Sequence, residues 1–297
     1  MKLEKWMSAP SARRVDYALL ALWPAGLALA LVNALVTTPV FAALAGIYIA
    51  FAAVTIQRVG MTGWSPAVTW VAAAVALFAI AGFTGEPTAR RPSLLAVNTA
   101  VLLVMSIAVL AGAVGLLLRL RRSPRLTVAV AAVAVFALGT GGFVLNLFAR
   151  LAIVLTGAEE QQLAVEATHW SAAQYLRGTT GPVDFVGYTL VWLDLVQIAY
   201  VVSAYAAAAG LAWLATGEAV VPRRFGTVLT MTACLLAATL TVSVGAAVAL
   251  PRAADAVPAT VAFVTSIPFM ATLLPYALGA AILATAAHRS RATQESK

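Results

Sequence analysis

The sequence predicts an all-α fold: a polytopic bundle that crosses a membrane about eight times, with its N and C termini on the cytoplasmic side. The first observation is composition. Of the 297 residues, 62% are hydrophobic and only 10% are charged, whereas a soluble domain carries about 25% charged residues. The second is a series of apolar stretches long enough to span a hydrocarbon core of about 30 Å. The third is the gathering of basic residues in alternate connecting segments.

The apolar stretches are continuous rather than alternating, which favours helices over the strands of a β-barrel. The basic segment before the first stretch resembles a secretory signal. The stretch is too long for a signal core, however, and is interpreted as an uncleaved first helix. In chain order the predicted spans are residues 17–36, 40–57, 66–83, 94–118, 126–155, 186–214, 227–250 and 260–287.

The breaks between these stretches are polar, and most contain proline, which cannot continue a helix. They are expected to alternate between the two sides of the membrane. In chain order they are outer at 37–39, inner at 58–66, outer at 86–92, inner at 119–125, outer at 156–185, inner at 223–224 and outer at 251–258.

The basic residues orient the predicted bundle. Fourteen of the nineteen Lys and Arg residues fall in inner segments, four fall in outer segments, and Arg150 lies within a span. Such a bias over short loops places the basic segments in the cytoplasm. We therefore expect a multi-pass protein of a cell membrane, the bacterial cytoplasmic membrane, in contact with the lipid bilayer. The net charge of +8 does not indicate nucleic-acid binding, because no basic domain or face carries it.

The polar link at residues 86–92 divides the chain into two unequal parts. Residues 1–90 hold three predicted spans, and residues 91–297 hold five, together with the long outer loop 156–185. The spans are rich in Ala, Gly, Ser and Thr, through which membrane helices pack closely. We therefore expect a compact bundle.

Two short motifs in the N-terminal part carry a resemblance. Arg14-Val15-Asp16-Tyr17 enters the first span, and Gln57-Arg58-Val59-Gly60-Met61-Thr62-Gly63-Trp64 follows the second. Residues 10–90 thereby resemble the bacterial inner-membrane domain of unknown function 805 family, which shows an Arg-x-x-Tyr-like entry and an Arg-Leu-His-Asp segment running into Ser-Gly-Trp. Arg58, Gly63 and Trp64 match that pattern. The His-Asp pair is absent, so the resemblance implies no activity.

Several chemistries are excluded by what the sequence lacks. Lysine occurs only at positions 2, 5 and 297, so no span offers a lysine for a retinal Schiff base. Two distant histidines, His169 and His288, cannot supply the axial ligands of an intramembrane haem. No phosphate-binding glycine loop appears. The single cysteine, Cys234, can form no intrachain disulfide and is expected to be a small buried residue. We predict no catalytic residue, no metal and no cofactor.

The long outer loop holds three candidate residues, His169, Trp170 and Asp184. One interpretation is a lid or an active site in which His169 acts as an acid or base. The other is a solvated cap, in which residues 159–177 form a surface helix with Trp170 at the headgroup level. The lack of motif spacing favours the cap.

Four polar residues within the fifth and sixth spans form a second candidate site: Arg150, Asp194, Asn146 and Gln197. Charges within spans are costly and mark a functional or pairing site. Arg150 lies roughly 9 Å and Asp194 roughly 12 Å below the outer ends of their helices, so we predict an ion pair. Asn146 and Gln197 share the faces of these charges and would form a polar pair one turn deeper. Two interpretations of these four residues are consistent with the sequence: a structural pair between helices, or part of a path for a translocated solute or a ligand.

A glycine-rich run, Gly139-Thr140-Gly141-Gly142, lies earlier in the fifth span. It permits either a kink at a binding site or the close approach of a neighbouring helix. Close packing is the favoured interpretation.

Together these features favour a transport-type membrane subunit, a permease or channel-like component of unknown substrate. A membrane scaffold or assembly subunit that contacts partner protein subunits is one alternative. A membrane enzyme acting on a lipid-linked substrate at the outer face is another, although the lack of a catalytic signature leans against an enzyme.

The charge bias predicts the outcome of a topology experiment. Reporters fused after Arg122 or at Lys297 are expected to report a cytoplasmic location, and a reporter inserted near Glu160 an external one. A compartment-dependent reporter activity in intact cells measures this. A cytoplasmic signal from the insertion near Glu160 would refute the orientation.

Overall fold

The structure is a computed structural model, and it describes residues 10–32, 38–60, 63–81, 92–155, 185–249 and 270–295. All regular secondary structure in these residues is helical, which confirms the predicted all-α fold. The described part contains eight α-helices and a short π-helix, η2, that continues α3. Their bounds are α1 (Pro10–Val32), α2 (Thr38–Gly60), α3 (Ser65–Ala76), η2 (Leu77–Ala81), α5 (Pro92–Arg119), α6 (Leu126–Leu155), α9 (Phe185–Gly217), α10 (Arg223–Ala249) and α12 (Met270–Glu295).

Six of these helices are long and apolar enough to cross a membrane, namely α2, α5, α6, α9, α10 and α12. The apolar segments of α1 and α3 are shorter, at Tyr17–Leu29 and Ser65–Ile80. Each predicted apolar stretch thus overlaps a helix, although residues 33–36, 82–83, 250 and 260–269 of the predicted stretches lie outside the described part. A multi-pass membrane protein in contact with the lipid bilayer follows from the six candidate spans.

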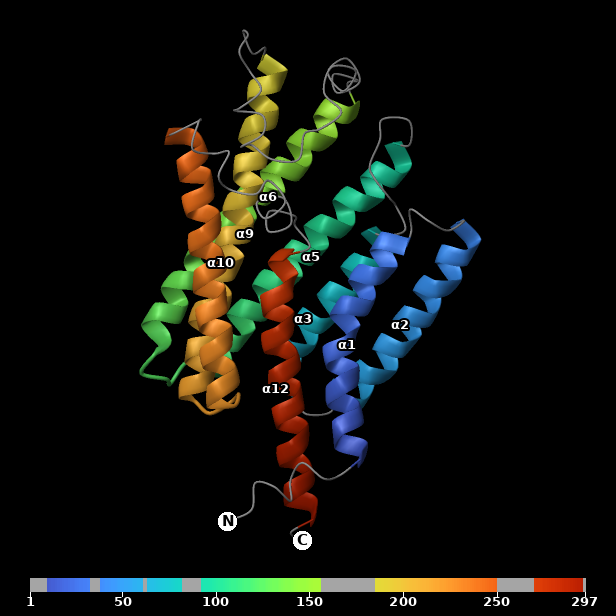
Figure 1. Cartoon of the computed structure of the whole chain (residues 1–297), viewed down its shortest axis with the longest axis vertical. Helices are drawn as coiled ribbons and strands as arrows, with labels where there is room; N and C mark the ends of the chain where they lie inside the picture. Colours follow the sequence, from blue (N-terminus) through green and yellow to red (C-terminus); the bar gives the residue numbers. More distant parts are fainter. Residues whose placement is uncertain are drawn as a thin grey trace.

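Among the candidate spans, α9 is the most enclosed. Within the molecule 78% of its span is buried, against 22–28% for α2, α5, α6 and α10. It packs along α6 on one side and α10 on the other, and it also contacts α12. α12 in turn packs against α3 and α1, and α2 lies at one edge of the bundle (Figure 1). The apolar outer helices are therefore the ones that face lipid.

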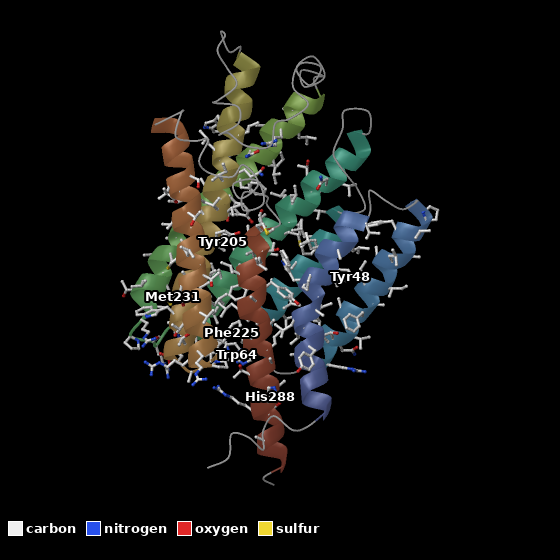
Figure 2. All side chains as sticks on the ribbon, in the orientation of Figure 1. Tyr48, Trp64, Tyr205, Phe225, Met231 and His288 are labelled. Atoms are coloured by element: carbon white, nitrogen blue, oxygen red, sulfur yellow. The ribbon has the colours of Figure 1, made fainter. Side chains whose placement is uncertain are left out.

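Successive helices run in opposite directions along the bundle, so their ends gather at two levels (Figure 1). The first residues of α1 and the last residues of α2, α5, α9 and α12 lie together at the lower end of Figure 1. Figure 2 shows Trp64 and His288 toward this end, among nitrogen-bearing side chains. We call it the arginine-rich end, since it carries Arg58, Arg119, Arg121, Arg122, Arg125, Arg223, Arg224 and Arg289.

Glycines allow the helices to approach one another closely. A Cβ atom at Gly112 of α5 would lie 2.7 Å from Trp70 Cδ1 on α3. One at Gly210 of α9 would lie 2.9 Å from Ala132 Cβ on α6. Membrane helices associate through such contacts because lipid offers no hydrophobic driving force between them.

The glycine-rich run of α6 does not interrupt the helix, which is continuous over Leu126–Leu155. A Cβ atom at Gly139 would collide with the side chain of Ser203 on α9, whereas one at Gly141 would meet nothing within 4 Å. At Gly139 the structure therefore shows close packing, the favoured interpretation.

The expectation of a buried Cys234 is wrong. Cys234 is exposed on α10, as are Met231 and Leu235 on the same helix. In a bilayer the outward face of a helix is as apolar as its core, so an apolar sequence context does not identify a buried position.

The packing of α6 predicts that two neighbouring substitutions differ in their effect on stability. Gly139→Ala is expected to lower the free energy of unfolding by about 1–3 kcal/mol, because the added methyl group collides with Ser203. Gly141→Ala adds the same methyl group in open space and is expected to leave stability unchanged or raise it by up to about 1 kcal/mol. Thermal unfolding of the purified variants in detergent measures both. Equal stability of the two variants would contradict the packing of Gly139 on α9.

Candidate functional site

An aromatic stack sets the register between α6 and α9. The rings of Phe143 and Tyr200 stack with their centroids 4.3 Å apart and their planes inclined by 8°. Phe136 packs on the same tyrosine with a centroid distance of 5.8 Å. Such stacks stabilise a contact beyond the area they bury. The stack on Tyr200 fixes the register of α6 against α9. It thereby determines which residues of the two helices face each other in their halves away from the arginine-rich end.

A polar network joins the two helices beyond the stack. The side chain of Asn146 is fully buried, and its Nδ2 donates a hydrogen bond to the backbone carbonyl oxygen of Leu193 on α9. Arg150, one turn along α6, donates from Nε to Asn146 Oδ1 at 2.9 Å. Because both the donor and the acceptor of the amide are used, the orientation of Asn146 is fixed.

The network places a positive charge inside a candidate span. Arg150 is half-buried and belongs to the span Leu126–Ala152. It precedes the end of α6 at Leu155 by about 8 Å, at roughly 1.5 Å per residue. A charge at such a depth is costly unless it finds a partner. The buried oxygen of Asn146 supplies one polar contact.

The structure brings together two of the four predicted span residues, Arg150 and Asn146. Asp194 follows Leu193 in α9, but its side chain lies outside the described part, so the ion pair with Arg150 stays a prediction. Gln197 is half-buried one turn further along α9. The outer-loop candidates His169, Trp170 and Asp184 fall outside the described residues.

Sequence reasoning missed a second polar cluster, around α1. Tyr48 and Tyr276 donate their hydroxyl groups to the carbonyl oxygens of Leu22, at 3.0 Å, and of Leu19. Both acceptors lie in the turns before Pro24, which interrupts the hydrogen bonding of α1. Pro24 removes the helical donor of the Leu20 carbonyl oxygen, not of either acceptor, so it gave no direct signal for these two bonds. The tyrosines tie α2 and α12 to this point of α1.

Asn98 on α5 was also missed. Its Oδ1 is buried and has no hydrogen-bond partner within the described part of the chain. A buried acceptor of this kind calls for an explanation. In the sequence Asn98 is a single asparagine in an apolar stretch, and nothing there indicates that its side-chain oxygen is buried.

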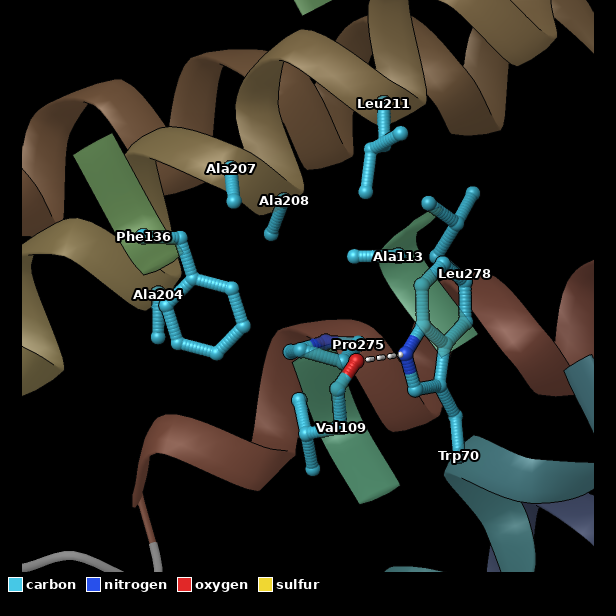
Figure 3. A pocket seen from close by; sticks show the side chains of 10 residues that line it. All are labelled: Trp70, Val109, Ala113, Phe136, Ala204, Ala207, Ala208, Leu211, Pro275 and Leu278. Carbon is cyan, nitrogen blue, oxygen red and sulfur yellow. Dashed lines mark hydrogen bonds between the residues drawn. The ribbon is translucent and has the colours of Figure 1, made fainter. Parts of the chain in front are cut away.

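A small apolar cavity lies where α3, α5, α6, α9 and α12 meet (Figure 3). Its volume of about 10 Å³ is close to that of one water-sized sphere. Trp70 forms one wall, and its indole N–H donates to the Val109 carbonyl oxygen at 2.9 Å. Apolar cavities of this size stay dry, so this point of the bundle provides no polar passage.

No three His, Cys, Asp or Glu side chains of the described residues come close enough together to hold a metal ion. Comparison of the chain with protein-family models, with curated proteins and with solved structures gives no match. The resemblance of residues 10–90 to the domain of unknown function 805 family therefore stays a hypothesis. Arg150 and Asn146 are the candidate site that the geometry supports.

The hydrogen bond between Asn146 and Arg150 predicts coupling in a double-mutant cycle. Asn146→Ala and Arg150→Ala are each expected to destabilise the protein by about 1–3 kcal/mol, since each removes a hydrogen bond from a polar group that stays half-buried or buried. The double variant is expected to lose at least about 0.5 kcal/mol less than the sum of the two.

Chemical unfolding in detergent measures the cycle, with Leu145→Ala as the control partner. Leu145 is exposed on the same helix, so its effect is expected to add to that of Arg150→Ala. Additivity in both cycles would mean that the Asn146–Arg150 bond carries no energy.

Proposed function

We propose that this chain is a transport-type subunit of the bacterial cytoplasmic membrane, a permease or channel-like component that crosses the bilayer eight times with both ends in the cytoplasm. The concentration of arginines at the end shared by the start of α1 and the end of α12 supports the orientation. For α1 and α3, whose apolar segments are short, crossing is part of the proposal.

The observation that carries the transport role is the charge held inside the bundle. Arg150 lies in a candidate span and is hydrogen-bonded to the buried Asn146, at the end of the molecule away from the other described arginines. Ionisable residues within membrane spans commonly mark the path of an ion or substrate. Arginine in a pore selects for anions, so Arg150 would form the entrance to a path for an anionic solute from the outer side.

A specific observation favours one alternative, a membrane scaffold or assembly subunit. The cavity at the centre of the bundle is small and lined by apolar groups such as Phe136, Ala204 and Pro275. The outward faces of the outer helices expose large apolar side chains, including Leu138 and Val228. A dry interior with apolar flanks suits a subunit that contacts partner proteins in the membrane. The third hypothesis, an enzyme at the outer face, depends on loop residues 156–185, of which all but Phe185 lie outside the described part of the chain.

Accessibility to water separates the two leading functions. In a Cys234→Ala background, Gln197→Cys and Asn146→Cys are exposed to a charged, membrane-impermeant thiol reagent added from the outer side. A transport path predicts that they react at least about tenfold faster than Leu145→Cys, which faces lipid, because thiolates form and react only where water reaches them.

Two controls make this result decisive. Leu138→Cys, also exposed on α6, gives a second lipid-facing baseline. Thermal unfolding shows whether each variant is folded. Site cysteines in a folded protein that react as slowly as both lipid-facing ones would overturn the transport proposal and favour the scaffold.

A further inference from the structure

A groove opens at the arginine-rich end, beside the turn that connects α5 to α6. Its volume is about 430 Å³, within the range of small-molecule sites. Arg119, Arg121 and Arg122 line it, together with Ser123 and Glu218. Three arginines against one glutamate leave a net charge of +2, so the groove favours an anion.

Two arginines beside the turn, Arg119 and Arg125, already form contacts within the protein. The guanidinium of Arg119 lies 4.0 Å from the ring centroid of Trp64 and donates to the Gly63 carbonyl oxygen at 2.6 Å. Gly63 has a φ of +74°, a conformation suited to glycine. Arg125 lies 4.9 Å from the ring centroid of Trp213 and donates to the carbonyl oxygen of that residue at 3.2 Å.

The turn itself is closed by short-range hydrogen bonds. Ser123 N donates to the Leu120 carbonyl oxygen at 3.0 Å, and Leu126 N donates to the Ser123 carbonyl oxygen at 3.2 Å. The buried Ser123 hydroxyl also accepts a bond from Arg125 N. The backbone that carries Arg121 and Arg122 is therefore fixed.

Arg121 and Arg122 are the charges left for a ligand. Both side chains are exposed, and no described residue forms a hydrogen bond or ion pair with either of them. An arginine guanidinium presents a planar fork of donors that fits the oxygens of a phosphate group. Because Arg121 and Arg122 are adjacent on a fixed turn, both guanidinium groups can bind the same phosphate group. Such a site binds one phosphate specifically, whereas isolated surface arginines attract small anions without a defined position.

The position of the groove indicates where the phosphate comes from. The candidate span of α5 ends at Arg119, and that of α6 begins at Leu126, so the turn lies at the level of the lipid headgroups. Tryptophans such as Trp64 and Trp213 are typical of this level. From the groove, an exposed apolar row leads along α5 into the membrane through Leu118, Val114 and Ile107.

We propose that this groove binds one anionic phospholipid, whose phosphate lies between Arg121 and Arg122 and whose acyl chains lie along the exposed row of α5. Basic pockets at the cytoplasmic ends of membrane helices recognise such headgroups. A free phosphate would gain nothing from the apolar row. The proposal rests on the membrane-embedded bundle and not on the transport role.

The test measures thermal unfolding of the full chain in zwitterionic detergent–phosphatidylcholine micelles during titration with phosphatidylglycerol. Saturating lipid is expected to raise the Tm of the native protein on the order of 5 °C. In the Arg121→Gln/Arg122→Gln variant the apparent affinity for phosphatidylglycerol is expected to fall about thirtyfold, because the charge-assisted hydrogen bonds of both guanidinium groups to the phosphate are lost. The Tm without added lipid should stay unchanged, because neither side chain has a partner in the described protein.

A matched variant, Arg223→Gln/Arg224→Gln, removes two exposed arginines from the same end, outside the groove. It is expected to keep its affinity for phosphatidylglycerol within about twofold, because Arg223 and Arg224 do not line the groove. General attraction to anionic lipid, which depends only on surface charge, would instead weaken binding equally in both double variants. Inorganic phosphate at the same concentration is expected to leave the Tm unchanged. Equal weakening in both double variants, an equal shift with inorganic phosphate, or no shift with phosphatidylglycerol would each overturn the proposal.

Discussion

Hydrocarbon supplies no hydrogen-bond partners, so each backbone polar group within the bilayer has to be satisfied inside the chain. Continuous helices meet this requirement, and they then associate mainly through shape. The arrangement around α9 follows from that constraint. Gly139 and Gly210 bring α6 and α9 close enough to share one face, and 78% of the α9 span is buried while its neighbours turn apolar surfaces outward.

The polar side chains that remain inside the bundle obey the same constraint. Trp70 and Tyr48 donate to backbone carbonyl oxygens of neighbouring helices, and so does Asn146. Such bonds satisfy the side chain and also tie one helix to the next. Arg150 differs, because its charge lies within a span and bonds a side-chain oxygen. That difference separates it from arginines such as Arg119, which stack on tryptophans at the membrane surface.

Features that depend on residues close together in the sequence were predictable, and contacts between helices were not. Helices were predictable because an apolar stretch of membrane length is a local property, and the shared helix face of Asn146 and Arg150 follows from their spacing of one helical turn. The hydrogen bond between these two side chains was not predicted. The Leu193 carbonyl was not predictable, since every residue has one and only the register of α9 selects it. Gly139 and Gly141 look alike in sequence, and only the position of α9 distinguishes them. Cys234 was misplaced because lipid-facing and buried positions are equally apolar.

The most direct test of a bundle arranged around α9 is carbene labelling from the lipid phase of nanodiscs that contain the purified protein, read out by peptide mass spectrometry. An enclosed α9 predicts labels on outward residues such as Met231 and Leu235 of α10, and almost none over Val201–Ala212, where most side chains are buried. Labelling of α9 as heavy as that of α10 would contradict the central position of α9.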